Sequence, residues 1–391
     1  MMKNEFIPLS VPNFQGNEWN YAEKAISAGW VSTAGQYVVE FEQKLAEYVG
    51  TGDAVSCQSG TSGLHLALMA LGVKAAHAVI VPTLTFIAAV NPVRYVGAEP
   101  IFMDCDSSLC MDPEKLDRFC EEECFFKKGK LFHKKTGKYI KAIIVVHVFG
   151  NMADMEKLMP TAEKYNLAVV EDATEALGTR YISGTYAGKY AGTIGDIGVF
   201  SFNGNKIITT GGGGMLVSKH MEHIETARHL STQAKKDDLY YLHDAVGYNY
   251  RMTNIQAALG VAQMEELEEF ITIKRRNYCL YRELLEKADG IELLPIRDGI
   301  RGNHWFYSLY CSGEKFQRDR LIEWLNSHNI QCRPVWGLIH EQEPYIKNFA
   351  YNIEEACRYW ERLVNIPCST NLTLVDIERV AEVIYEMADY G

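Results

Sequence analysis

Short apolar runs alternate with helix-length segments through the first two thirds of the chain. The runs are rich in β-branched residues and are bounded by polar or turn-forming residues, as is typical of buried strands. The predicted strands are Ala78–Val81, Glu99–Met103, Ala142–Val148, Leu167–Val170, Ile197–Phe202 and Gly214–Val217. Between several of them lie segments of helical length, such as Met155–Tyr165. The pattern therefore predicts an α/β fold, in which a mostly parallel sheet carries helices on both faces.

Two later segments depart from this alternation. Phe125–Ile140 contains two short strand-like pieces around turns rich in lysine and glycine, which predicts a surface β-hairpin inserted into the α/β unit. From Asn254 to about Lys287 apolar residues recur every three or four positions, which predicts one long helix. We therefore expect a large α/β domain over residues 1–255, followed by a linking helix and a smaller α+β domain over residues 256–391.

Composition narrows the class of protein. The 391 residues are 47% hydrophobic and carry a formal net charge of -11, without a long lysine or arginine block. No nucleic-acid partner is expected, because electrostatic capture of a polyanion requires a concentrated basic patch. The chain has neither a run of about eighteen apolar residues nor the pattern of a secretory leader, so we expect a cytoplasmic protein without a membrane partner.

The ten cysteines are expected to be reduced thiols, because no secretion signal accompanies them. One cluster stands out in the sequence, formed by Cys105, Cys110, Cys120 and Cys124. Its spacing lacks the close pairs that are typical of a zinc site, so no metal is expected.

A candidate anion site begins at Gln58. The segment Gln58–Gly63 (QSGTSG) precedes the apolar helical run Leu64–Leu71. Small residues here leave backbone N–H groups free at the positive end of the helix, which suits a phosphate. The same pattern is also typical of a plain helix N-cap, so the segment by itself leaves both interpretations open.

Two acids end a predicted strand in Val169–Glu175 (VVEDATE). Ligands of open α/β sheets bind at the carboxyl edge of the strands, where this pair would lie. A carboxylate there can pair with the protonated nitrogen of a pyridine cofactor and keep the ring an electron sink. The alternative interpretation is a helix N-cap with an acidic first turn.

Lys206 lies between a predicted strand and the four glycines Gly211–Gly214. Glycines permit positive φ angles and a close approach of the backbone to a ligand. A lysine beside buried elements can lose its proton, and Schiff-base chemistry requires a neutral amine. Most lysines are simply solvated, but a lysine framed by Ser201, Asn205 and a glycine run is not typical of that majority.

These spacings resemble those of fold-type I enzymes that use pyridoxal 5′-phosphate (PLP), with Asp172 34 residues before Lys206 and Ser201 five before it. Such enzymes have a sheet of seven-stranded type in the large domain. More closely, the chain resembles the DegT/DnrJ/EryC1/StrS family of sugar aminotransferases. The matching stretches follow the family's order and cover nearly the whole chain: Ile7–Pro12, Pro82–Ala88, Val146–Asn151, Glu171–Gly178, Ser201–Lys206, Gly247–Ala257 and Arg333–Trp336.

The resemblance implies roles around the cofactor. Lys206 would bind PLP as a Schiff base, and Asp172 would pair with the ring nitrogen. Phe86 would stack on the pyridine face, and Glu175, where many relatives have Gln, would hydrogen-bond the ring hydroxyl. The phosphate would be held by residues from several segments, namely Gly60, Thr61, Ser201 and the Asn249 of a neighbouring subunit. A homodimer with shared active sites is therefore implied.

The resemblance also implies a substrate class. Arg251, Trp336 and His340 occupy positions at or near the sugar pocket of relatives, although packing is the alternative for the last two. The absence of an acid at position 212, together with Glu175 and the hairpin insertion, resembles the branch acting on 4-keto-6-deoxy N-acetylated hexoses, which includes the legionaminic-acid pathway. We therefore expect a C4 aminotransferase that moves an amino group from glutamate to a nucleotide-linked keto-sugar.

Several alternatives stay open. A C3 or perosamine-type aminotransferase of the same family is one, and a PLP-binding regulator without turnover is another, although a complete lysine, aspartate and phosphate set favours turnover. The sequence does not indicate whether the nucleotide is UDP, GDP or dTDP. His147, which ends a predicted strand, is either a buried core histidine or a donor in the pocket.

Overall fold

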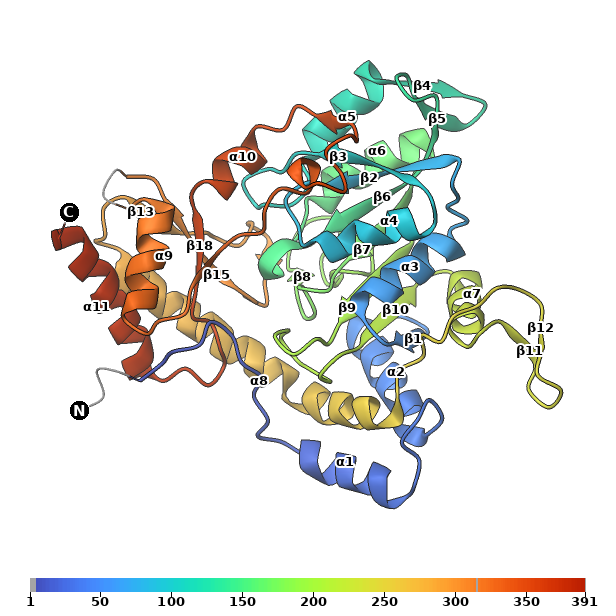
Figure 1. Cartoon of the computed structure of the whole chain (residues 1–391), viewed down its shortest axis with the longest axis horizontal. Coiled ribbons are helices and arrows are strands. Elements are labelled where there is room, and N and C mark those ends of the chain that lie inside the picture. The colour runs from blue at the N-terminus through green and yellow to red at the C-terminus, as the bar shows by residue number, and fades with distance from the viewer. Residues whose placement is uncertain (1–4, 314–315, 391) are drawn as a thin grey trace.

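The computed structural model describes residues 5–313 and 316–390 (Figure 1). Among these residues, ten strands form one central sheet. Eight of them follow one another across it in the order β1 (Ala54–Cys57), β10 (Gly214–Ser218), β9 (Ile197–Ser201), β7 (Ala168–Asp172), β6 (Tyr139–Val146), β2 (His77–Pro82), β3 (Glu99–Met103) and β17 (Ala350–Tyr351). The other two, β4 (Cys124–Lys127) and β5 (Lys130–His133), form a hairpin attached to β6.

The sheet is parallel from β9 to β17 and antiparallel at β10, at β1 and at the β4–β5 hairpin. The predicted α/β fold with a mostly parallel sheet is therefore confirmed. Its central strands are continuous runs of buried residues, because helices cover both faces. The register places Val146, Asp172 and Val199 side by side, so the strands deliver neighbouring side chains to one carboxyl edge.

Helices pack around this sheet (Figure 1). They are α2 (Gln36–Val49), α3 (Gly60–Ala70), α4 (Asn91–Tyr95), α5 (Pro113–Glu122), α6 (Met155–Tyr165) and α7 (Met221–Ser231), with 3₁₀ turns at Ile87–Ala89 and Val148–Gly150. The first helix, α1 (Glu18–Ser27), packs against the long helix α8 (Asn254–Leu285) instead. The start of α3 matters for the site. Ser59 and Ser62 form a capping box there, in which each side chain bonds the other residue's backbone N–H, so the helix begins at Gly60.

A second, smaller sheet lies at the other end of the molecule (Figure 1). Its strands, in spatial order, are β13 (Ile291–Leu293), β15 (Tyr307–Cys311), β18 (Leu363–Ile366) and β16 (Arg333–Pro334), and it packs with α9 (Arg318–Ser327) and α11 (Leu374–Tyr390). The remaining elements are β8 (Arg180–Tyr181) with β14 (Ile300–Arg301), β11 (Lys235–Asp237) with β12 (Leu242–His243), a 3₁₀ turn at Ile339–Glu341, and α10 (Glu355–Trp360).

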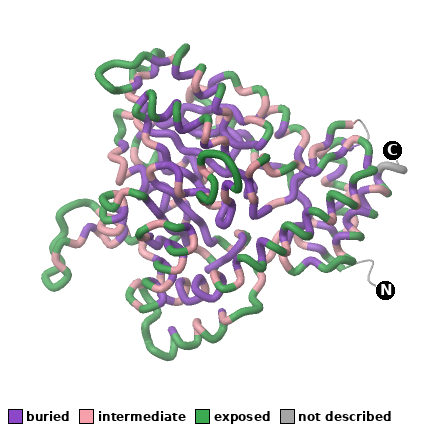
Figure 2. Tube along the Cα trace, turned by 180° about the vertical axis from the view of Figure 1, so that it is seen from behind, coloured by how far each residue is buried: buried purple, intermediate pink, exposed green. Residues whose placement is uncertain are grey.

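Each sheet has its own hydrophobic cluster, and α8 (Asn254–Leu285) runs through both. Val261 and Phe270 of α8 pack in the larger cluster, whereas Tyr278 and Tyr281 pack in the smaller one. The 32 residues of this helix span about 48 Å at the usual rise per residue. Figure 2 shows the buried residues concentrated inside both parts. No helix in the described part of the chain is long and apolar enough to cross a membrane.

Candidate active site

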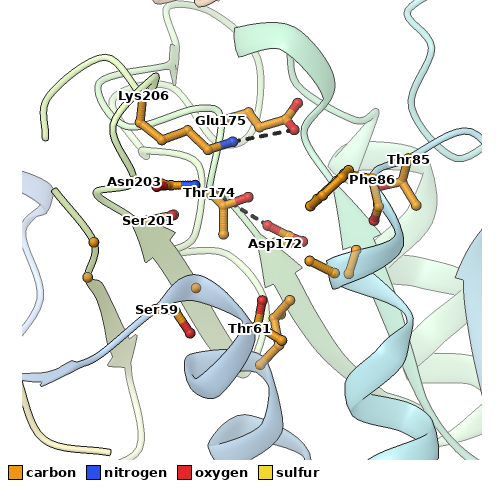
Figure 3. Close-up of a pocket in the computed structure, with 16 residues that line it drawn as sticks. Ser59, Thr61, Thr85, Phe86, Asp172, Thr174, Glu175, Ser201, Asn203 and Lys206 are labelled. Carbon is orange, nitrogen blue, oxygen red and sulfur yellow. Dashed lines mark hydrogen bonds and ion pairs between the residues drawn. The ribbon is translucent and has the colours of Figure 1, made fainter. Parts of the chain in front are cut away.

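Two strand ends and the turn that follows one of them build the candidate site. Asp172 is the last residue of β7 and Ser201 the last of β9, and Lys206 lies in the turn after β9 (Figure 3). They line one cavity of about 200 Å³. The full lining is Ser59, Gly60, Thr61, Leu64, Thr85, Phe86, Ala88, Ala89, Asp172, Thr174, Glu175, Ser201, Asn203, Lys206, Gly212 and Gly213. The cavity thus lies at the carboxyl edge, where open α/β sheets bind ligands.

The Lys206 amine is enclosed. Its side chain is 12% exposed, and its Nζ lies 3.6 Å from Glu175 Oε1 and 3.7 Å from the centre of the Trp305 ring. Burial lowers the pKa of Lys206 below its ordinary value, and the negative charges of Glu175 and Asp172 oppose that shift. Lys206 therefore loses its proton more easily than an exposed lysine does, and the neutral amine is the nucleophilic form.

Asp172 is a buried carboxylate. Its Oδ1 accepts a hydrogen bond of 3.1 Å from the Thr174 N–H, and within the described ranges it forms no ion pair with a lysine or arginine. Burial raises the pKa of Asp172 above its ordinary value. A positively charged group placed beside it would stabilise the ionised form.

Glu175 connects the lysine to the loop after β6. Its Oε2 accepts a hydrogen bond of 2.9 Å from the N–H of Phe149, and its Oε1 faces Lys206. Burial raises the pKa of Glu175 to about 7, against the opposing charge of Lys206. Phe86 forms the facing wall of the cavity and is 53% exposed, so a flat group could cover its ring (Figure 3).

The N-terminus of α3 forms the end of the cavity opposite Lys206 and Glu175 (Figure 3). The first N–H groups of a helix have no acceptor within it, so Gly60 and Thr61 offer donors at the positive end of the helix dipole. A Cβ on Gly60 would lie 2.8 Å from Thr174 Cγ2 and 3.0 Å from Ser201 Cβ, so a side chain would not fit without displacing these neighbours. An anion can therefore approach the backbone closely here.

The three parts of the cavity match the three reactive parts of PLP. A helix N-terminus suits the phosphate, a buried carboxylate suits a protonated ring nitrogen, and a buried amine suits the aldehyde. All three line the same cavity. The residues present therefore fit this cofactor.

Seven of the eleven residues predicted for the site line this cavity: Gly60, Thr61, Phe86, Asp172, Glu175, Ser201 and Lys206. Asn249 lies outside it, exposed and bridged to Thr232, and Arg251 is half-buried. Trp336 packs 4.7 Å from the Phe149 ring, and the Nδ1 of His340 lies 2.6 Å from Thr83 Oγ1. The roles assigned to all eleven residues stay predictions.

His147 belongs to the core and not to the cavity lining. Its Nδ1 accepts the N–H of Ala153, so its Nε2 carries the proton and donates to Glu171 Oε2 at 2.8 Å. Burial disfavours the Glu171 charge, but hydrogen bonds from His147 and the N–H groups of Gly192 and Gly195 hold its pKa below the ordinary value. Of the two interpretations left open, the structure supports the buried core histidine.

Sequence reasoning missed Trp305, which touches the lysine. Its indole Nε1 donates to the Asn205 carbonyl at 2.6 Å, and its own carbonyl accepts a hydrogen bond from the buried Lys274. Trp305 lies 99 positions after Lys206, outside every motif used above, so no local pattern could have found it. Thr174 and Asn203 also line the cavity, and both lie inside matched motifs.

Known proteins share both the sequence pattern and the fold. The DegT/DnrJ/EryC1/StrS aminotransferase family matches residues 12–385. The chain is 37% identical over 380 residues to the GDP-perosamine synthase of Caulobacter vibrioides, covering 96% of each chain. It is 29% identical over 363 residues to the UDP-4-amino-4,6-dideoxy-N-acetyl-beta-L-altrosamine transaminase of Campylobacter jejuni, covering 92% of each. A crystal structure of a DegT DnrJ EryC1 StrS aminotransferase from Brucella abortus superposes with a TM-score of 0.85 at 28% identity, covering 95% of each. The chain therefore belongs to the DegT/DnrJ/EryC1/StrS aminotransferase family.

Proposed function

We propose that this chain, a PLP-dependent aminotransferase, transfers an amino group to the C4 keto carbon of a nucleotide-linked 4-keto-6-deoxy hexose. The observation that carries the proposal is the shared cavity of a buried amine, a buried carboxylate and a helix N-terminus. Two charged groups are costly to bury without a ligand, so their presence in one cavity favours a chemical role over packing.

Each residue has a distinct task in this proposal. When bound, PLP supplies an electron sink for the carbanion that transamination requires. Lys206, as a neutral amine, takes a proton from the donor carbon and later returns one, because its burial favours the neutral form. Asp172 stays ionised beside the ring nitrogen and keeps it protonated. Gly60, Thr61 and Ser201 hold the phosphate, while Phe86 covers the ring and excludes water.

The names of two relatives support the substrate class. The Caulobacter vibrioides relative is named for a GDP-linked product and the Campylobacter jejuni relative for a UDP-linked 4-amino sugar. A nucleotide-linked sugar and the C4 position are therefore the proposed substrate class and site of reaction. Arg251, Trp336 and His340 are proposed to line the sugar side of the site, and glutamate is the proposed donor.

A homodimer is part of the proposal. The β11–β12 hairpin projects from the molecule and carries Leu239, Tyr240 and Tyr241 at 76%, 71% and 73% exposure (Figure 1). Apolar side chains displayed in this way mark an interaction surface. Asn249 follows the hairpin and is exposed. A second copy that covers the hairpin would bring Asn249 to the phosphate end of its partner's cavity.

A second candidate substrate is a sugar with a 2-hydroxyl group, as in the perosamine-type alternative. The higher identity to the GDP-perosamine synthase favours it, at 37% against 29% for the N-acetyl relative. Glu175, the glycine at position 212 and the hairpin insertion favour the 2-acetamido sugar instead. We propose the 2-acetamido sugar as the preferred substrate.

The test is turnover with glutamate and a panel of UDP-, GDP- and dTDP-linked keto-sugars that differ in the position of the ketone and in the group at C2. Mass spectrometry would follow the conversion of a ketone to an amine. We expect the highest kcat/KM for a 4-keto-6-deoxy sugar with a 2-acetamido group. Equal or better kcat/KM with the 2-hydroxy sugar would support the perosamine type. Amination at C3 alone would contradict the proposed position, and no turnover across the panel would contradict the substrate class.

A further inference from the structure

Positive charge gathers on the β4–β5 hairpin. Residues 125–141 contain seven lysines and no aspartate or glutamate, in a chain whose formal net charge is -11. Along the sequence these lysines occur singly or in pairs. Pairing of β4 with β5, and of β5 with β6, brings them into one region of the surface.

The strand register sorts this region into two faces. Phe125 lies opposite Phe132 and Lys127 opposite Lys130, so these four side chains point to the same side. Tyr139 of β6 lies beside Phe132 and continues the row. We call these five residues the lysine–aromatic face. On the other side of the hairpin, Cys124, Leu131 and His133 are buried, whereas Phe126 is exposed.

Few of these lysines form ion pairs with residues that the structure describes, although the acidic run Glu121–Glu123 directly precedes the hairpin. Of the seven lysines, Lys138 is the one that forms an ion pair within the described residues, 2.8 Å from Glu99. Lys127 and Lys130 face each other directly across the two strands, and like charges in such positions destabilise a hairpin. An anionic partner would relieve this repulsion.

The hairpin is remote from the cavity. It joins β6 at Tyr139 and Ile140, whereas Val146 at the other end of β6 lies beside Asp172. Six residues of strand separate the two ends by about 20 Å. The hairpin also projects from the molecule, and the views from front and back show its exposed tip (Figures 1 and 2). A large surface could therefore meet the hairpin without covering the active site.

We propose that the lysine–aromatic face docks on an anionic lipid bilayer. Lysines attract the negative surface of such a bilayer, and aromatic rings next to them suit its interfacial layer. Without the seven lysines the formal net charge would be -18. An anionic bilayer therefore repels the rest of the molecule, and the protein approaches the bilayer with the hairpin leading. A peripheral membrane partner of this kind differs from the expectation of no membrane partner, because docking on a bilayer surface requires no spanning segment. The docking proposal does not depend on the proposed substrate.

A single-stranded nucleic acid is the competing partner, because it also binds basic and aromatic surfaces. Such binding requires open ring faces on which bases can stack. Here the Phe125 and Phe132 rings already stack on each other at 5.3 Å and 13°, and Lys130 lies over the Tyr139 ring at 5.2 Å. The ring faces are thus partly occupied, whereas their edges and the lysine amines remain available to a bilayer surface.

The test uses the full-length protein and vesicle flotation. One set of vesicles contains phosphatidylcholine alone, and the other contains phosphatidylglycerol as well. We expect binding only to the anionic vesicles, with loss of binding between about 0.05 and 0.5 M salt because exposed charges are screened. Lys127→Glu/Lys130→Glu should weaken this binding by at least about 25-fold, since each lysine near an anionic surface contributes about fivefold.

A matched control shows whether binding depends on where the two positive charges lie or only on the net charge of the protein. Lys189→Glu/Lys287→Glu changes two exposed lysines outside the hairpin and alters the net charge equally, and it should retain most of the binding. Lys127→Gln/Lys130→Gln gives a milder change and guards against misfolding. Absence of binding to anionic vesicles, equal losses in both Glu variants, or binding to an oligothymidylate in place of the vesicles would each overturn the proposal.

Discussion

The buried floor of the cavity and the exposed segment around Asn249 differ in what one chain supplies. Asp172 and Lys206 are enclosed by neighbours of the same chain, and burial shifts the pKa of both. Asn249 is exposed and follows a hairpin of exposed apolar residues. The comparison teaches that one chain completes the charged part of the site, whereas the proposed last phosphate contact requires a second chain. Variants of the two regions should therefore fail in different ways.

Removal of the Lys206 amine should have the largest effect. Lys206→Ala should lower turnover by about 10⁴-fold or more, because the group that moves the proton is absent. The long-wavelength absorbance of a lysine-bound cofactor should also disappear. Lys189→Ala, at an exposed lysine, is the matched control and should leave both unchanged. Turnover like that of the wild type in Lys206→Ala, without added amines, would show that this lysine is not catalytic.

Asp172→Asn should have the next largest effect. The amide keeps the shape and the hydrogen bond from Thr174 but carries no charge, so turnover should fall by about 10²- to 10³-fold. Cofactor occupancy, measured by absorbance after gel filtration, should fall far less. Asp289→Asn at an exposed position serves as the control. An unchanged kcat would make Asp172 only a cap for the following turn.

Glu175 should make the stability of the cofactor-free chain depend on pH. Its pKa is about 7 in the folded chain against an ordinary 4.5, so the folded state holds more protons between these values. The free energy of unfolding should therefore fall as the pH rises from about 4.5 to 7, by at most about 3 kcal/mol. Glu175→Gln should flatten this slope in urea titrations, whereas Glu323→Gln at an exposed position should not. An unchanged slope in Glu175→Gln would contradict the raised pKa.

Mixing variants gives the smallest but most direct test of the comparison. Asn249→Trp should block the phosphate end of a partner's site, and Lys206→Ala disables its own site. After subunit exchange of equal amounts, half of the dimers are mixed and each has one intact site, so about a quarter of the wild-type activity should return. The separate variants provide the baseline. No recovery after exchange, or full turnover by a dilute monomer, would rule out sites shared between chains.

Strongly patterned segments predicted the fold well. Glu99–Met103 and Met155–Tyr165 have the predicted bounds, and the long helix begins at Asn254, where Thr253 and Gln256 form a capping box. The strand β17 was missed because its two residues are too few for a periodic pattern. The short β1, with a serine among its four residues, was missed for a similar reason.

The candidate site was predictable where its residues share local motifs. Asp172, Ser201 and Lys206 follow buried strands, and the parallel register then brings them together. Trp305 reaches Lys206 only through tertiary packing, which no local pattern encodes. The lysines of the β4–β5 hairpin are close together in the sequence, but only the strand register shows which of them share a face with aromatic rings.

The helix α8 also determines how the protein responds to heat. One continuous helix supplies Val261 to the larger cluster and Tyr281 to the smaller one. Loss of packing in either cluster therefore exposes part of the helix on which the other cluster also packs. An isolated helix gains little stability from its own hydrogen bonds and depends on packing along its length. Unfolding at one end therefore weakens the other, and α8 makes the two clusters a single cooperative unit.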